Sequence, residues 1–135
     1  MASGVPLQRH SEIAAAKEAG VKIISGSDCG GDTLARFGLN GCALAALVDC
    51  GLSAMDAIVA PTGTAANALA IDDKLGSVRP GLQADLIVID GDPSEDIWLL
   101  TPERPAVRSV FLRGVHFAGV AREQDRATLP LTPLH

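Results

Sequence analysis

Apolar residues recur at helical spacing in the first half of the chain. Residues 11–19 are predicted to form a helix that Ser11 caps and Gly20 ends. Residues 39–50 carry leucine and valine on one face, as an amphipathic helix does, and Gly51 follows them. The pattern therefore predicts two helices, each with a glycine stop.

A further helical stretch follows Gly51. Ser53 and Asp56 have the spacing of a capping box, and Pro61 is predicted to end the helix that they start. Another short helix should come next, with Thr62 and Thr64 as alternative caps.

Strand patterns mark three other places in the chain. Residues 21–27 are rich in β-branched side chains and follow a glycine, which predicts a strand. Residues 86–89 are apolar at every position, so both faces of that strand should be covered. Residues 107–113 and 115–118 flank Gly114 and are predicted to form a hairpin.

Turn residues frame the strand at 86–89. Pro80 and Gly81 suit the two central positions of a type II turn, and the Asp-Gly and Asp-Pro pairs of residues 90–93 end the strand. Asp85 could be read as a catalytic carboxylate. Its position beside the turn favours a structural role, in which it accepts hydrogen bonds from loop N–H groups.

Composition narrows the classes of protein. The 135 residues are 47% hydrophobic and 20% charged, which is typical of a soluble globular chain. A net charge of −5 and a lack of basic stretches argue against nucleic acid and anionic membranes as partners. No apolar stretch approaches the ~18 residues of a membrane span, and the first residues lack signal-peptide character. A cytoplasmic location is expected.

Cysteines and histidines give no ligand pattern. The cysteines lack C-x-x-C spacing and are expected to be free thiols: Cys29, Cys42 and Cys50. The histidines are far apart and are expected at or near the surface: His10, His116 and His135. Neither a disulfide framework nor a zinc site is therefore predicted from them.

Three motifs, in this order, resemble the C-terminal part of the amidohydrolase superfamily. Residues 20–28, Gly-Val-Lys-Ile-Ile-Ser-Gly-Ser-Asp, are similar to the eighth barrel strand of that family. Residues 48–58 resemble its Gly-Leu-Thr-Pro helix junction, and residues 60–62 occupy its Ala-Ala-Thr position. Residues 76–93 resemble its C-terminal signature, Gly-Ser-Ile-x-x-Gly-x-x-Ala-Asp-Leu.

The resemblance implies an α/β fold made of two parts. Residues 1–75 would be the last strand-helix unit of a TIM-like barrel, and residues 76–122 the C-terminal strands of the family's composite β domain. Residues 123–135 are expected to be a flexible tail. A complete barrel takes ~250 residues, so 135 residues cannot close one.

Asp28 is the one residue to which the resemblance assigns catalysis. As the family's aspartate it would bind a divalent, zinc-type metal and take a proton from the metal-bound water, for delivery to the leaving amine. The alternative is an Asp that caps the following loop. The family's His-x-His and later histidines have no counterpart here, and a zinc site needs about three protein ligands. The chain alone is therefore expected to hold no metal stably.

Two hypotheses follow. In the first, the chain is the C-terminal part of a metal-dependent amidohydrolase that cleaves amide or cyclic amide C–N bonds of a small molecule. It would be inactive until an N-terminal chain completes it. In the second, it is a non-catalytic module that forms homo-oligomers through exposed strand edges.

Overall fold

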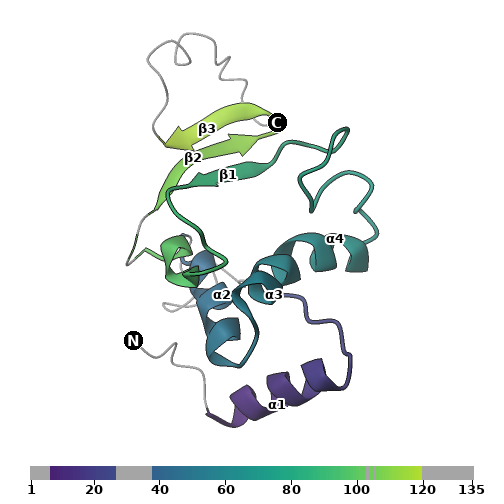
Figure 1. Ribbon diagram of the computed structural model, residues 1–135. Coiled ribbons are helices and arrows are strands. Elements are labelled where there is room, and N and C mark those ends of the chain that lie inside the picture. Colours follow the sequence, from purple (N-terminus) through teal and green to yellow (C-terminus); the bar gives the residue numbers. More distant parts are fainter. Residues whose placement is uncertain (1–6, 27–37, 103, 105, 120–135) are drawn as a thin grey trace.

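The computed structural model describes residues 7–26, 38–102, 104 and 106–119, with side chains from residue 11 onward. Its helical segments are α1 (Leu7–Glu18), α2 (Asn40–Asp49), α3 (Ala54–Val59), the π-helix η1 (Ala60–Thr64), α4 (Ala65–Ala68) and the 3₁₀-helix η2 (Ile97–Leu100). Its strands are β1 (Leu86–Ile89), β2 (Val107–Leu112) and β3 (Val115–Gly119). Figure 1 shows the strands together at one end and α1 to α4 towards the other. The predicted mixed α/β class is confirmed.

The first two helices end where the sequence predicts. α1 gives way to a turn at Gly20, and α2 to a turn that includes Gly51. The predicted start of α1 is wrong, because the helix begins at Leu7 and Ser11 lies inside it. Residues 7–10 are Leu, Gln, Arg and His, which include good helix formers and no breaker.

Pro61 does not end the third helix, contrary to the prediction. The chain continues from α3 through η1 into α4, and Pro61 lies in the π-helical turn. A proline has no N–H to donate and its ring needs room, and the wider π turn meets both conditions. Thr62 donates its hydroxyl to the carbonyl of Ile58 at 2.7 Å. Thr64 precedes α4 with helical backbone angles and no side-chain cap bond, so neither predicted cap is confirmed.

Residues 21–26 form no strand, so the strand predicted for 21–27 is wrong over this range, and Ser27 lies outside the described residues. A strand is held by hydrogen bonds to a neighbour. No other described segment pairs with residues 21–26. Val21 and Ile24 are both exposed there.

The three strands form one antiparallel sheet in the order β1-β2-β3. The predicted hairpin is confirmed: β2 and β3 are joined by Arg113 and Gly114, both with positive φ (52° and 79°), as a type I′ turn requires. The predicted cover on both faces of β1 is wrong, since Ile87 is 53% exposed. Val88, the next residue along the strand, is 48% exposed.

The loop before β1 has the predicted turn. The backbone N–H of Leu82 donates to the carbonyl of Arg79 at 3.2 Å, and Gly81 has a φ of 91°, the value that favours glycine in a type II turn. The turn directs the chain into β1.

The buried interior of the described chain is small and mostly helical. Its apolar members are Ala45, Cys50, Leu52, Ala57, Ala60, Ala66 and Ile97. Gly41 in α2 lies so close to η2 that a Cβ there would collide with the Leu100 carbonyl. No residue of the three strands is buried. The helices therefore share a core that the sheet does not join.

Candidate functional site

Asp28, the predicted catalytic residue and metal ligand, lies outside the described residues, and so does Cys29. The described segment stops at Gly26, two positions before Asp28. The structure therefore leaves the Asp28 assignment as an expectation.

The described residues bring no metal-binding group together. No cluster of three or more His, Cys, Asp or Glu side chains that could hold an ion occurs among them. The described residues therefore do not form a metal site by themselves.

His116 lies in the sheet. Its ring meets the Phe111 ring edge-to-face, with centroids 5.3 Å apart at 75°. Its Nε2 is buried and has no hydrogen-bond partner among the described residues. Of the other histidines, His10 lies in α1 and His135 lies outside the described residues.

Cys50 follows α2 and is a buried free thiol. Burial, with a smaller effect of Asp49, raises the pKa of its thiol. A raised pKa leaves less thiolate at neutral pH, so Cys50 is not suited to be a nucleophile.

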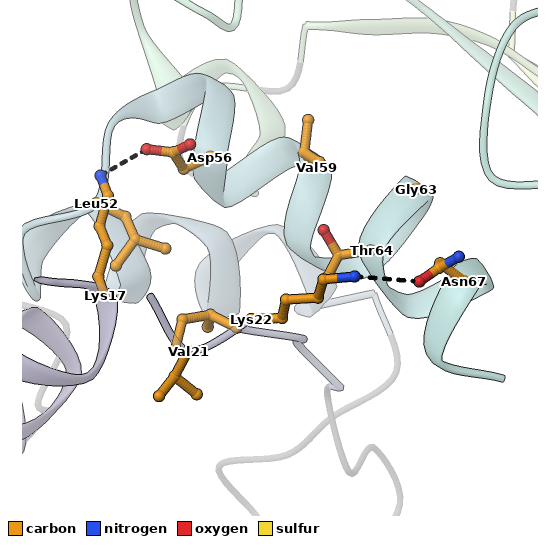
Figure 2. A pocket seen from close by; sticks show the side chains of 10 residues that line it. Lys17, Val21, Lys22, Leu52, Asp56, Val59, Gly63, Thr64 and Asn67 are labelled. Atoms are coloured by element: carbon orange, nitrogen blue, oxygen red, sulfur yellow. Dashed lines mark hydrogen bonds and ion pairs between the residues drawn. The ribbon is translucent and has the colours of Figure 1, made fainter. Parts of the chain in front are cut away.

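A cleft of about 430 Å³ lies between the segment after α1 and the continuous helix α3-η1-α4. Figure 2 shows Val21 and Lys22 on one side and Val59, Thr64 and Asn67 on the other. Lys22 Nζ donates to Asn67 Oδ1 at 3.4 Å across it. The lining includes Ile23, five positions before Asp28, and the described residues that line the cleft offer binding contacts but no metal site.

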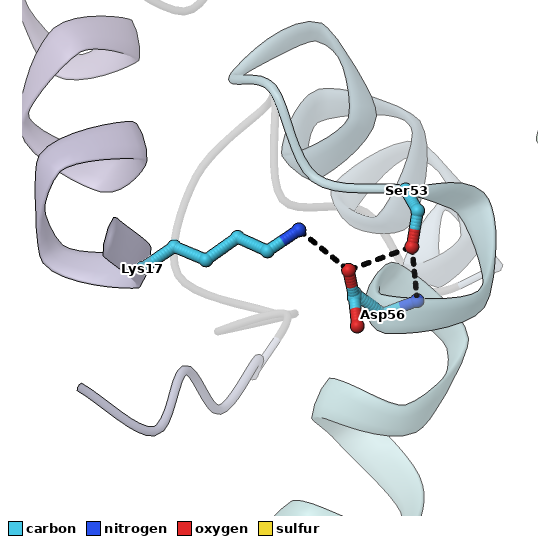
Figure 3. A network of polar contacts seen from close by, with 3 residues as sticks. All are labelled: Lys17, Ser53 and Asp56. Carbon is cyan, nitrogen blue, oxygen red and sulfur yellow. Dashed lines mark hydrogen bonds and ion pairs between the residues drawn. The ribbon is translucent and has the colours of Figure 1, made fainter. Parts of the chain in front are cut away.

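A polar network fixes one end of this cleft. Lys17 Nζ donates to Asp56 Oδ2 at 2.6 Å, and Ser53 Oγ donates to the same oxygen at 2.6 Å (Figure 3). The N–H of Asp56 donates to Ser53 Oγ at 3.1 Å, which confirms the predicted N-cap. The bond from Lys17, then that from Ser53, lowers the pKa of Asp56. Sequence reasoning missed Lys17, because nothing local links two residues 39 positions apart.

Asp85 takes the structural role that the sequence predicts. Its Oδ1 accepts a 2.7 Å hydrogen bond from the backbone N–H of Arg113, at the β2-β3 turn. Its Oδ2 accepts from Gln83 Nε2 at 2.5 Å. These bonds, that of Arg113 first, lower the pKa of Asp85. The carboxylate thus ties the loop before β1 to the hairpin.

A second cleft, of about 580 Å³, lies between the helix α3-η1-α4 and the loop that leads to β1. Its wall includes Ile58, Leu69, Leu75 and Leu86. The loop approaches the helix closely at Gly76, where a Cβ would collide with Ala66. The lining is mainly aliphatic and suggests packing rather than chemistry.

Residues 7–116 match the amidohydrolase family. The chain belongs to this family. The resemblance to this family, drawn from residues 20–28, 48–58, 60–62 and 76–93, is thereby confirmed.

This amidohydrolase chain is similar to a curated protein and to several solved structures. It is 38% identical to the imidazolonepropionase of Picrophilus torridus over 66 residues, which are 49% of this chain and 16% of that protein. A solved amidohydrolase is 30% identical, with a TM-score of 0.74, over 84% of this chain and 26% of its own. A Xaa-Pro dipeptidase with bound methionine in its active site is 37% identical, with a TM-score of 0.71, over 83% of this chain and 26% of its own.

The chain thus spans about a quarter of the length of these two solved relatives. No helix in its described part combines the length and apolar character of a membrane span.

Proposed function

We propose that this chain forms the C-terminal part of a metal-dependent amidohydrolase that cleaves amide or cyclic amide C–N bonds in a small molecule. The observation that carries the proposal is the family match over residues 7–116. Both named relatives, an imidazolonepropionase and a Xaa-Pro dipeptidase, support a hydrolase. The cysteines, which lack disulfide spacing, support a cytoplasmic location.

The proposal includes a barrel origin for residues 21–27. Val21, Ile23 and Ile24 give this segment strand composition, yet its described part has no strand neighbour. In the proposal, neighbouring barrel strands come from sequence beyond this chain, in the same polypeptide or in a complementing one. Residues 21–27 then pair as the last barrel strand.

Asp28 is the proposed contribution of this chain to the active centre. A carboxylate at the C-terminal end of a barrel strand faces the pocket where such folds carry out their chemistry. No cluster of metal-binding side chains occurs among the described residues, so the proposal takes the other ligands, histidines, from the complementing part. Alone, the chain is expected to be inactive.

Reconstitution tests the proposal. The probe is a chain with the first three quarters of the Xaa-Pro dipeptidase relative, mixed with this chain and zinc. A Xaa-Pro dipeptide is the first substrate, because that relative matches 83% of this chain, and imidazolonepropionate is the second. We expect zinc binding and turnover by the mixture, with neither for this chain alone. Asp28→Asn should abolish the turnover, and Asp73→Asn, an exposed control, should not.

Two results would contradict the proposal. One is stoichiometric zinc together with turnover by the chain alone. The other is a stable complex with the complementing part that has no hydrolase activity towards either substrate. The second result would favour the alternative, a non-catalytic module, which the uncovered strands also support.

A further inference from the structure

No further inference is drawn: the strongest candidate, the apolar face of the β1-β2-β3 sheet at Ile87, Leu112 and Val115, carries none, because nothing in the described part of the structure shows what covers it.

Discussion

The carboxylate of Asp85 connects two parts of the chain that are distant in sequence. It accepts the N–H of Arg113 at the hairpin turn, and the Gly114 N–H donates to the carbonyl of neighbouring Ala84 at 2.9 Å. Arg113 has positive φ, so its N–H points out of the strand ladder and needs an acceptor elsewhere. The aspartate immediately before β1 fills this need, which explains an Asp in an otherwise apolar stretch without any catalytic role.

The lowered pKa of Asp85 makes this contact pH-dependent. A carboxyl group whose pKa is lower in the folded state stabilises the fold above its unfolded pKa of about 3.9. That stability is lost as the pH falls through the folded-state pKa. We expect Asp85→Asn, which keeps an acceptor oxygen, to lower the melting temperature slightly at pH 7 and to flatten its fall in acid. Asp85→Ala should lower it further.

Thermal unfolding followed by circular dichroism between neutral and acidic pH provides the measurement. Asp73→Asn is the control, because Asp73 is an exposed aspartate away from the hairpin contact. An Asp85→Asn profile that runs parallel to that of the parent chain would contradict the role assigned here.

Ala70 is a second residue in an unusual position. It follows α4 with a φ of 55°, and the N–H of Ile71 donates to the Ala66 carbonyl at 3.0 Å, as in a Schellman motif. The equivalent residue after α2 is Gly51, whose φ is 96°. An alanine in this region is strained, whereas glycine is not.

Ala70→Gly should therefore stabilise the chain, by about 0.5–1 kcal/mol. Ala68→Gly, inside α4, should instead destabilise it by about 1 kcal/mol, since glycine is a poor helix former. Urea unfolding measures both changes. Destabilisation by Ala70→Gly would show that residue 70 does not hold the left-handed conformation in solution.

At the scale of elements, the network of Lys17, Ser53 and Asp56 joins the end of α1 to the start of α3. The Ser53 cap satisfies one N–H at the helix start, and Asp56 lies in the first turn, where a negative charge suits the helix dipole. The ion pair is exposed, so its own contribution is small and falls with salt.

The cap should contribute more than the ion pair. We expect Ser53→Ala to cost about 1 kcal/mol in urea unfolding at any salt concentration. Ser53→Thr, which keeps a hydroxyl, should cost much less. Lys17→Met should show a loss that shrinks as salt is added. If Ser53→Ala has no effect on stability, water must accept the hydrogen bond of the Asp56 N–H as well as the Ser53 hydroxyl does.

Structural features that depend only on residues close in sequence could be predicted. Gly51 after α2, the Ser53 cap and the turn at Pro80 and Gly81 each depend on nearby residues alone. The continuation of the helix through Pro61 could not be predicted, because a proline argues against an α-helix and carries no signal for a π turn. The state of residues 21–26 could not be predicted, because strand composition gives no information on whether a partner strand is present. Asp28 was reached only through a resemblance between motifs.

At the scale of the whole molecule, a helical core and an uncovered sheet lie in one chain, and residues 21–26 lie beside the core without strand partners. A larger enzyme with neighbouring barrel strands would give this segment backbone hydrogen bonds that it lacks here. The apolar Ile23 and Ile24 fit a strand packed on both sides better than an exposed loop. We therefore expect residues 21–26 to form a strand when this chain associates with the complementing part of the enzyme.

Amide hydrogen exchange gives the test. In the chain alone, the amides of residues 22–26 should exchange nearly as fast as those of an unfolded peptide, because they lack the hydrogen bonds of a strand ladder. Amides at the centre of β2, which pairs on both sides, are the internal control and should exchange more slowly. Addition of the complementing dipeptidase part should slow exchange in residues 22–26 at least about tenfold if they enter a barrel. Protection equal to that of β2 in the chain alone would mean that the segment already has a strand partner, which would contradict the barrel completion argued here.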